Sequence, residues 1–477
     1  MYFELFKYFN VLNDDAKLEL NSLLKKIITF ILKFLLYIML YHILKRIIAI
    51  GIRLYYKEIK ITNYKNLPQK GPCIYIANHP NTLMDAWIIG FISKEPIYFM
   101  AKASFFSSPI RQKLLKSLNI IPINRSSDQK IDGISNQDSF EACYKILEEG
   151  KSILIFPEGT SFLERRLREL KTGTARIAIE AERRNNNKLG LQIIPLGLNY
   201  VDAERFRSRV LIHVGTPIKI YDYLHQSVEN HGIVAKKLTE QFRVYLEQVL
   251  VNSAEKEDEI IVKELHQIFV SKYIKQQEKG VKGEFKFLKQ IRDKITEINV
   301  SEPWKIEQIK TSLHILKSKL DNFGIKSDFL DRRFRIKMFF RQLFFSFLYL
   351  LIGLPLFLYG CIHNIIQFKL TDLIVPKLTK DLEYYAPLNI LLGLILYPFI
   401  YLGFLFYVKY TFNLNFLEQV IYFLSMPISG LLAYSISSYF KHVLSKWKFV
   451  FTILKDKKRV LEVKQEKENL RTLIFGE

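Results

Sequence analysis

Short apolar runs recur between residues 57 and 222, and segments with helical spacing separate several of them. The apolar runs cover 73–77, 97–101, 120–123, 153–156, 191–198 and 210–214. Apolar residues recur at helical spacing in 108–118, 135–149 and 172–184, and Gly150 is placed to end the second of these segments. Strands that alternate with helices predict an α/β domain over 57–222, with a mostly parallel sheet and flanking helices.

The pattern differs on either side of this domain. Residues 1–56 predict membrane-associated helices. The apolar run 27–44 could just span a bilayer, and the basic residues in and after it fit an interfacial helix or a helical hairpin equally well, with the interfacial arrangement slightly favoured. Residues 223–337 mix apolar residues with Lys and Glu, which predicts an α-helical segment and leaves its role open. Residues 338–440 predict a transmembrane region, and residues 441–477 a basic cytoplasmic tail.

Apolar stretches at 342–362, 387–408 and 419–437 are each long enough to cross a bilayer, and the last two form a hairpin. Basic residues flank the region on both sides, which requires an even number of crossings, whereas there are three candidates. A first stretch that is re-entrant or broken near Pro355, or an interfacial segment over 363–380, would resolve the conflict.

Composition supports a membrane protein. The 477 residues carry a formal net charge of +23, and 49% of them are hydrophobic. This combination is typical of a membrane protein that has membrane lipids as partners and whose soluble parts face an anionic membrane surface. A nucleic-acid partner is not expected, because long apolar runs replace the usual basic and aromatic modules. The three cysteines show no zinc spacing and fit a reducing compartment.

The first candidate site is the turn that follows the apolar run 73–77. It delivers His79 and, six residues later, Asp85 to the start of a predicted helix. A carboxylate that orients a His ring lets that His take a proton from an attacking hydroxyl. The pattern also fits a helix cap, with Thr82 as N-cap and Asp85 three residues on, and the two interpretations are compatible.

A second turn of this kind, Phe156–Ser161, follows the apolar run 153–156. Gly159 lets the backbone approach a ligand, and the N–H groups of such a turn can bind an oxyanion or a phosphate. Glu158 can accept a hydrogen bond from a substrate hydroxyl, although a Pro-Glu-Gly turn capped by Thr160 would look the same. Because open α/β sheets bind ligands at the carboxyl ends of strands, we expect both turns to form one active site.

Two cations are candidates for binding a phosphate. Arg125 stands at the end of the apolar run 120–123, and a guanidinium matches phosphate geometry. Lys171 precedes a Gly-containing helix start, which favours anions. The arginines at 165, 166 and 168 are more typical of a solvated or membrane-facing basic surface.

Together these stretches resemble the glycerolipid acyltransferase family, which includes lysophosphatidic acid and glycerol-3-phosphate acyltransferases. The resemblance covers 57–222. It rests on four ordered blocks, which are Asn78-His79 with Asp85, then Arg125, then Phe156-Pro157-Glu158-Gly159-Thr160-Ser161, then Ile194-Pro195-Leu196-Gly197.

The resemblance implies that His79 is the general base and that Asp85 orients it. The substrate-binding candidates are Asn81, Arg125, Glu158, Gly159, Thr160 and Lys171. The block 194–197 would line the acyl side. The acyl donor would be acyl-CoA or acyl-carrier protein, with no metal, no other cofactor and no covalent enzyme intermediate.

The implied function is that of a membrane-bound O-acyltransferase of phospholipid biosynthesis, which acylates a glycerol-phosphate acceptor. It implies an integral membrane protein with a cytoplasmic catalytic domain, at the inner or plasma membrane in a bacterium. Five residues separate His79 from Asp85, where the commoner family pattern has four. That spacing, together with Leu170-Lys171-Thr172-Gly173 and the C-terminal membrane segments, resembles the branch with fungal glycerol-3-phosphate/dihydroxyacetone-phosphate acyltransferases. The acceptor can therefore be lysophosphatidate or glycerol-3-phosphate.

Other functions fit the residues less well. A serine lipid hydrolase would carry a Gly-x-Ser-x-Gly turn, which the chain lacks. An acyltransferase for another lyso-lipid and a non-catalytic membrane scaffold of the same fold stay open. The presence of both His79 and Asp85 argues against the scaffold. The sequence does not indicate the oligomeric state.

Overall fold

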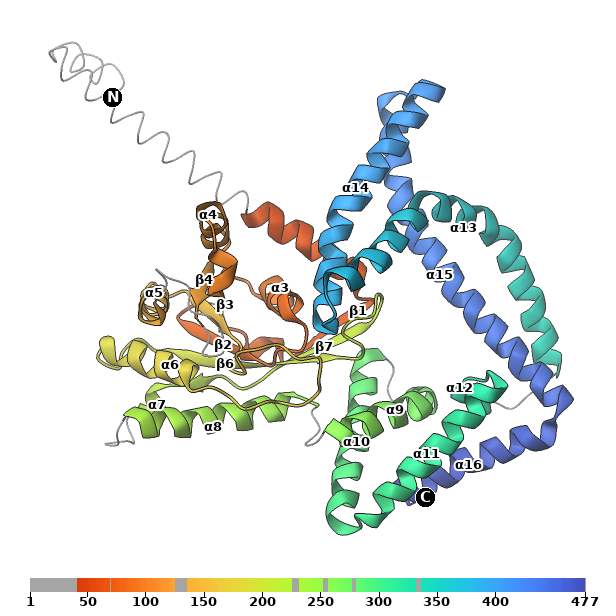
Figure 1. The fold of residues 1–477 in the computed structure, drawn as a ribbon, viewed down its shortest axis with the longest axis horizontal. Coiled ribbons are helices and arrows are strands. Elements are labelled where there is room, and N and C mark those ends of the chain that lie inside the picture. Colours follow the sequence, from red (N-terminus) through yellow and green to blue (C-terminus); the bar gives the residue numbers. More distant parts are fainter. Residues whose placement is uncertain are drawn as a thin grey trace.

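We describe the protein from a computed structural model, which covers residues 41–68, 70–124, 135–224, 231–251, 256–276, 280–331 and 336–476. These residues form an α/β unit, a bundle of helices and three long apolar helices (Figure 1). Most of the apolar run 27–44 expected near the N-terminus, and Arg125, lie outside the described residues.

Within the described ranges, eight strands form one sheet in the order β1-β7-β6-β2-β5-β3-β4, with β8 paired to β6. Their bounds are β1 (Glu58–Thr62), β2 (Cys73–Ala77), β3 (Ile97–Lys102), β4 (Ile120–Ile123), β5 (Ser152–Ile155), β6 (Gln192–Tyr200), β7 (Arg209–Val214) and β8 (Ile218–Lys219). Pairing is parallel except where β6 meets β7 and β8. The mostly parallel α/β fold expected from the sequence is therefore confirmed.

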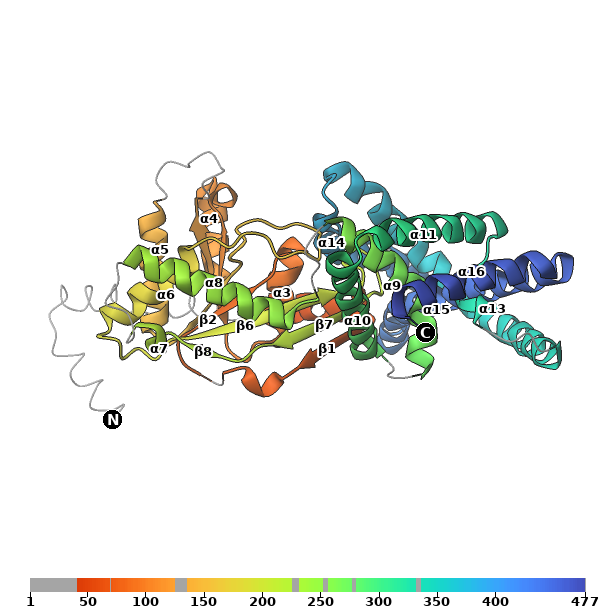
Figure 2. The same cartoon turned by 90° about the horizontal axis from the view of Figure 1, so that it is seen from below.

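Helices cover both faces of the sheet, because successive strand residues point to opposite faces. One face carries α5 (Asn136–Glu148), α6 (Gly173–Arg184) and α8 (His231–Val249), and Figure 2 shows α8 lying across the sheet. The other face carries α3 (Thr82–Ile92) and the helix over residues 41–55. The short helices α4 (Pro109–Ser117) and α7 (Tyr221–Leu224) complete the unit.

Helix α8 extends the α/β unit past the boundary expected at residue 222. Val234, Leu238, Phe242 and Leu246 recur every four residues and are buried against the sheet. Four-residue spacing places side chains on one face of a helix, so the apolar stripe of α8 belongs to the core of the sheet. The segment predicted as one helical region from 223 to 337 is therefore divided between two units.

The second unit is a bundle of helices with its own core. It contains α9 (Lys256–Gln276), α10 (Gly280–Ser301), α11 (Trp304–Phe323), α12 (Ser327–Leu330) and α16 (Lys457–Phe475). Val460, Val463, Leu470 and Ile474 of α16 are buried in that core. The expected basic tail over 441–477 is thus folded, because its apolar residues share one helix face.

Three described helices are long and apolar enough to cross a membrane, and they are α13 (Ile336–Leu378), α14 (Tyr385–Phe412) and α15 (Phe416–Lys455). Helices α14 and α15 form the expected hairpin, with a turn at 413–415. Helix α13 contains Pro355 and follows an arched path (Figure 1). Its start follows α12, which packs on α9, and its end leads to the short helix η3 (Leu382–Tyr384), which packs on α3.

The arch of α13 predicts a specific membrane topology. Since both ends of α13 adjoin water-soluble units, Lys380 and Lys458 should lie on one side and Asn413 on the other. Helix α14 has 28 residues, and this length, about 42 Å, suffices to cross the ~30 Å hydrocarbon core. Cysteine variants at these positions, made in a Cys361→Ser background that leaves only the buried Cys73 and Cys143, can be labelled with an impermeant maleimide in sealed vesicles. Labelling of positions 380 and 413 from the same side would contradict the topology.

Candidate active site

The turns after β2 and β5 meet because these strands are parallel neighbours, with Ile76 paired to Ile155. The turn after β2 is fixed to β6 through Asn78. The side chain of Asn78 donates to the carbonyl of Leu198 (3.0 Å) and accepts from its N–H (2.8 Å). The strand order therefore brings the two turns predicted from the sequence to one edge of the sheet.

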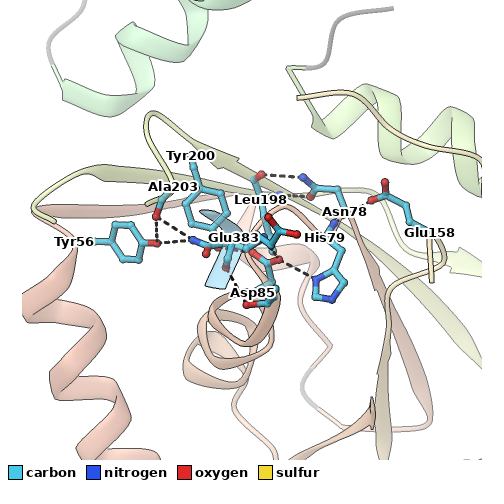
Figure 3. A network of polar contacts seen from close by, with 11 residues as sticks. Tyr56, Asn78, His79, Asp85, Glu158, Leu198, Tyr200, Ala203 and Glu383 are labelled. Atoms are coloured by element: carbon cyan, nitrogen blue, oxygen red, sulfur yellow. Dashed lines mark hydrogen bonds and ion pairs between the residues drawn. The ribbon is translucent and has the colours of Figure 1, made fainter. Parts of the chain in front are cut away.

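His79 and Asp85 form a hydrogen-bonded pair in this turn (Figure 3). His79 Nδ1 lies 2.9 Å from Asp85 Oδ2, and Asp85 is fully buried. Because an ionised carboxylate accepts hydrogen bonds and cannot donate them, Nδ1 carries the proton. The other ring nitrogen, Nε2, is then the proton acceptor of the neutral imidazole.

Asp85 is held in place by two further donors. Its Oδ2 accepts from the Asn81 N–H (2.7 Å), and its Oδ1 accepts from the Tyr200 hydroxyl (2.6 Å). Burial and the neighbouring Asp85 carboxylate raise the pKa of Tyr200 well above its usual value, so its hydroxyl stays protonated and donates. The orientation of the carboxylate is thus determined before any substrate arrives.

The helix entry differs from the predicted cap. Asn81, rather than Thr82, is the N-cap residue of α3, and its side chain does not cap the helix. Instead, Asp85 reaches back to the Asn81 N–H, one residue further along than the capping-box position that we expected. The side chain of Asn81 is fully buried and donates to Tyr56 Oη (3.1 Å) and Ala203 O (3.0 Å), so it anchors the turn.

The second turn supports the first. The Phe156 ring stacks on the His79 ring, with centroids 3.8 Å apart and an interplanar angle of 5°. Glu158 Oε1 accepts from the His79 N–H (3.0 Å), and Oε2 accepts from the Arg168 N–H (3.1 Å). Burial raises the pKa of Glu158, and these two backbone donors oppose that shift. Glu158 therefore binds backbone groups of the site.

The His79 ring contributes to the wall of a cavity of about 660 Å³. One part of the wall comes from the second turn and the start of α6, namely Gly159, Ser161, Lys171, Thr172, Thr174 and Arg176. The other part is apolar and comes from residues 41–55, α3, β3 and the short helix η2 (Ala103–Phe106), namely Leu44, Ile48, Trp87, Phe91, Phe99, Met100 and Phe105. The cavity thus joins a polar, basic region to an apolar one at His79.

Some of the predicted substrate-binding residues line the cavity at His79, and others lie outside it. Gly159 and Lys171 line the cavity, and the Lys171 side chain lies over Gly159, whose φ is +77°. A Cβ at position 159 would approach that lysine chain to 3.2 Å, so Gly makes room for it. Thr160 lines a neighbouring surface groove together with Glu158.

The block 194–197 does not line the cavity as expected. Ile194 and Leu196 are fully buried in the core of the sheet, within the central strand β6. It is the end of this strand that reaches the site, where the Tyr200 hydroxyl contacts Asp85. Sequence reasoning missed Tyr200, because one tyrosine at a strand end has no distinguishing pattern.

The described residues contain no group of three or more His, Cys, Asp or Glu side chains placed to hold a metal ion. The site residues that the structure brings together are an imidazole, a buried carboxylate, a lysine and the start of a helix. The first N–H groups of α6 have no acceptor within the helix, so that end of α6 favours an anion.

Residues 58–199 match the family model described as acyltransferase. A chloroplast 1-acyl-sn-glycerol-3-phosphate acyltransferase from Arabidopsis thaliana is 29% identical over 151 residues, which are 31% of this chain and 38% of that protein. A 1-acyl-sn-glycerol-3-phosphate acyltransferase from Borreliella burgdorferi is 28% identical over 183 residues, 38% of this chain and 66% of that protein. Glycerol-3-phosphate O-acyltransferase 1 from Saccharomyces cerevisiae is 26% identical over 28% of this chain and 18% of its own length.

The crystal structure of a 1-acyl-sn-glycerophosphate acyltransferase from Thermotoga maritima aligns with 43% of this chain and 78% of its own, at 18% identity and a TM-score of 0.32. The matched region spans 38% of the Arabidopsis thaliana relative and 39% of two further 1-acyl-sn-glycerol-3-phosphate acyltransferases, from Brassica napus and Chlamydomonas reinhardtii. The family model and the named relatives confirm the resemblance to acyltransferases that the sequence predicted. Residues 58–199 of this chain therefore form a domain of the acyltransferase family.

Proposed function

We propose that the chain is a membrane-bound O-acyltransferase of glycerolipid synthesis. It transfers a fatty acyl group from acyl-CoA or acyl-carrier protein to a hydroxyl of lysophosphatidate or glycerol-3-phosphate. The observation that carries the proposal is the His79–Asp85 pair, whose ring borders a cavity with a basic and an apolar part. The names of the acyltransferase relatives support the same class of acceptor.

In the proposed reaction, His79 Nε2 takes the proton of the acceptor hydroxyl as its oxygen attacks the thioester carbonyl. The tetrahedral intermediate collapses, the carbon–sulfur bond breaks, and the imidazolium returns the proton to the leaving thiolate. Asp85 keeps the ring in the required tautomer and stabilises its positive charge. Backbone N–H groups of the second turn stabilise the oxyanion.

The two parts of the cavity suit the two ends of the reactants. Lys171 and the start of α6 offer positive charge to the acceptor phosphate, which orients its hydroxyl toward His79. Arg125, outside the described residues, remains a second candidate for that phosphate. The apolar wall, with Trp87 and Phe99, suits an acyl chain. Three apolar helices keep the site at the bilayer that holds the lipid product.

We assign Glu158 a supporting role. Both of its oxygens already accept backbone N–H groups, one from His79 and one from Arg168. Glu158 is buried and is not among the residues that line the cavity at His79. Glu158 therefore acts by connecting the two turns, and Asn81 acts in the same way on the other side of His79.

Replacement of His79 by Ala should abolish transfer, because no other group would accept the hydroxyl proton. The protein in liposomes would be supplied with radiolabelled acyl-CoA and, in parallel, glycerol-3-phosphate and lysophosphatidate. We expect the wild type to acylate one acceptor, and the variant to do so at a rate lower by about 10³-fold or more. The loss is large because His79 both takes the hydroxyl proton and returns it to the leaving thiolate. Wild-type transfer that the variant retained would exclude His79 as the base.

Replacement of Glu158 by Gln should destabilise the site, because an amide N–H₂ would face one backbone N–H. A buried N–H left without an acceptor costs about 1–3 kcal/mol, so the thermal unfolding temperature should fall and kcat should fall with it. The Glu141→Gln variant, at an exposed ion pair with Arg184, is the matched control. An unchanged unfolding temperature with a raised acceptor KM would instead indicate that Glu158 binds substrate.

A further inference from the structure

We propose that the junction between membrane helices α13 and α14 positions the His79–Asp85 pair by holding Thr82 in a strained conformation. The junction is the segment 379–384, which includes η3. The proposal deepens the function proposed above and rests on it. It makes the membrane region a part of the catalytic arrangement as well as an anchor.

Thr82 has an unusual backbone conformation. Its φ is +42°, although it is a β-branched residue at the first position of α3. Positive φ is uncommon outside glycine, and for a β-branched residue it is a genuine outlier. Such a conformation persists only where its surroundings impose it. It occurs here between His79 and Asp85, within the five residues that separate them.

The conformation of Thr82 explains how His79 and Asp85 can be in contact although five residues separate them. Asn81 is the N-cap, so Asp85 lies in the first turn of α3 and points back toward the turn. The left-handed residue at 82 redirects the chain at the entry of the helix. Asp85 thereby reaches both the Asn81 N–H and the His79 ring.

The membrane region supplies the group that contacts Thr82. The Thr82 hydroxyl donates to the main-chain carbonyl of Glu383 at 3.0 Å, across 301 positions of sequence. Thr82 is 6% exposed, so this hydrogen bond is shielded from water. Figure 3 shows Glu383 beside Asp85 in the same network. The neighbouring Tyr384 lines the catalytic cavity.

The junction is held firmly enough to act as a fixed support. Ala386 and Ile390, in the first turns of α14, are buried in the same core as Met84 and Ile88 of α3. Gly51 lies so close to Ile390 that a Cβ there would approach it to 2.9 Å. Closely packed interiors are hardly compressible, so the Glu383 carbonyl is fixed relative to the sheet.

Residues 81 and 82 are thus held from two directions. Asn81 is tied to Tyr56 and Ala203 of the α/β unit, and Thr82 is tied to the membrane junction. Loss of the second tie should let residue 82 relax toward negative φ and move Asp85 away from His79. Such a change should lower kcat more than it alters KM, because Asp85 acts through His79 on the reacting hydroxyl.

Three substitutions at Thr82 separate this role from packing. Val keeps the size and the β-branch but removes the hydroxyl, Ser keeps the hydroxyl, and Gly tolerates positive φ without any support. We expect kcat to fall about tenfold or more in Thr82→Val, since without the hydrogen bond nothing on the membrane side holds residue 82 at positive φ. Thr82→Ser should stay close to wild type, and Thr82→Gly should be more active than Thr82→Val.

A packing role predicts the opposite order, with Val close to wild type and Gly the least active, because Val is isosteric and Gly leaves a void. The matched control is Thr62→Val, which removes a threonine-to-carbonyl hydrogen bond to Ile212 in β7, outside the active site. Hydrogen exchange of the full-length protein, followed by mass spectrometry, adds a measurement that is independent of activity. Amides in 80–88 should exchange faster in Thr82→Val and at the wild-type rate in Thr82→Ser.

The outcomes distinguish the positioning role from the proposed function. Wild-type transfer with Thr82→Val as active as Thr82→Ser, or with Thr82→Gly the least active, would overturn the positioning role and leave the function intact. Absence of wild-type transfer to any acceptor would overturn the function. In that case the hydrogen exchange of residues 80–88 still tests the role of the Thr82–Glu383 hydrogen bond. An unchanged exchange rate in Thr82→Val would contradict that role, and a faster rate would support it.

Discussion

The buried carboxylate of Asp85 is the group on which the site depends. It accepts hydrogen bonds from the His79 ring, the Asn81 N–H and the Tyr200 hydroxyl, and none of it is exposed to solvent. A buried charge without such partners would be neutralised or would destabilise the fold. The three donors therefore occupy both oxygens of the Asp85 carboxylate, and the bond at Oδ2 fixes the orientation of the His79 ring. The strands and turns around the site serve this arrangement.

The donors to Asp85 come from two parts of the fold. His79 and Asn81 follow β2, Tyr200 ends β6, and the turn after β5 supports His79 through Phe156 and Glu158. Parallel pairing of β2 with both β5 and β6 brings these ends together. The membrane region adds the Glu383 carbonyl at Thr82. The site is therefore a product of sheet order and of one contact between distant segments.

Local pattern predicted the α/β unit well, because apolar strand runs and helical spacing are local signals. The same signals placed His79 and the second turn at strand ends, and Asp85 at the start of the following helix. They could not show that Glu158 turns toward backbone groups, since a sequence does not fix the direction of a carboxylate. Nor could they place α8 on the sheet or α16 in the helical bundle, because those helices find their partners only in the folded chain. Tyr200 and Glu383 were missed for the same reason.

The most direct test of this account is the rate of acyl transfer by Asp85→Asn. Asn nearly matches the size of Asp85 but places an amide against His79 and removes the negative charge. The account predicts that kcat falls by roughly 10³–10⁴-fold while the protein remains folded in the membrane, as expected when a His base loses its orienting carboxylate. A variant that is folded and retains kcat within about tenfold of the wild type, a difference of only ~1.4 kcal/mol in barrier, would contradict it.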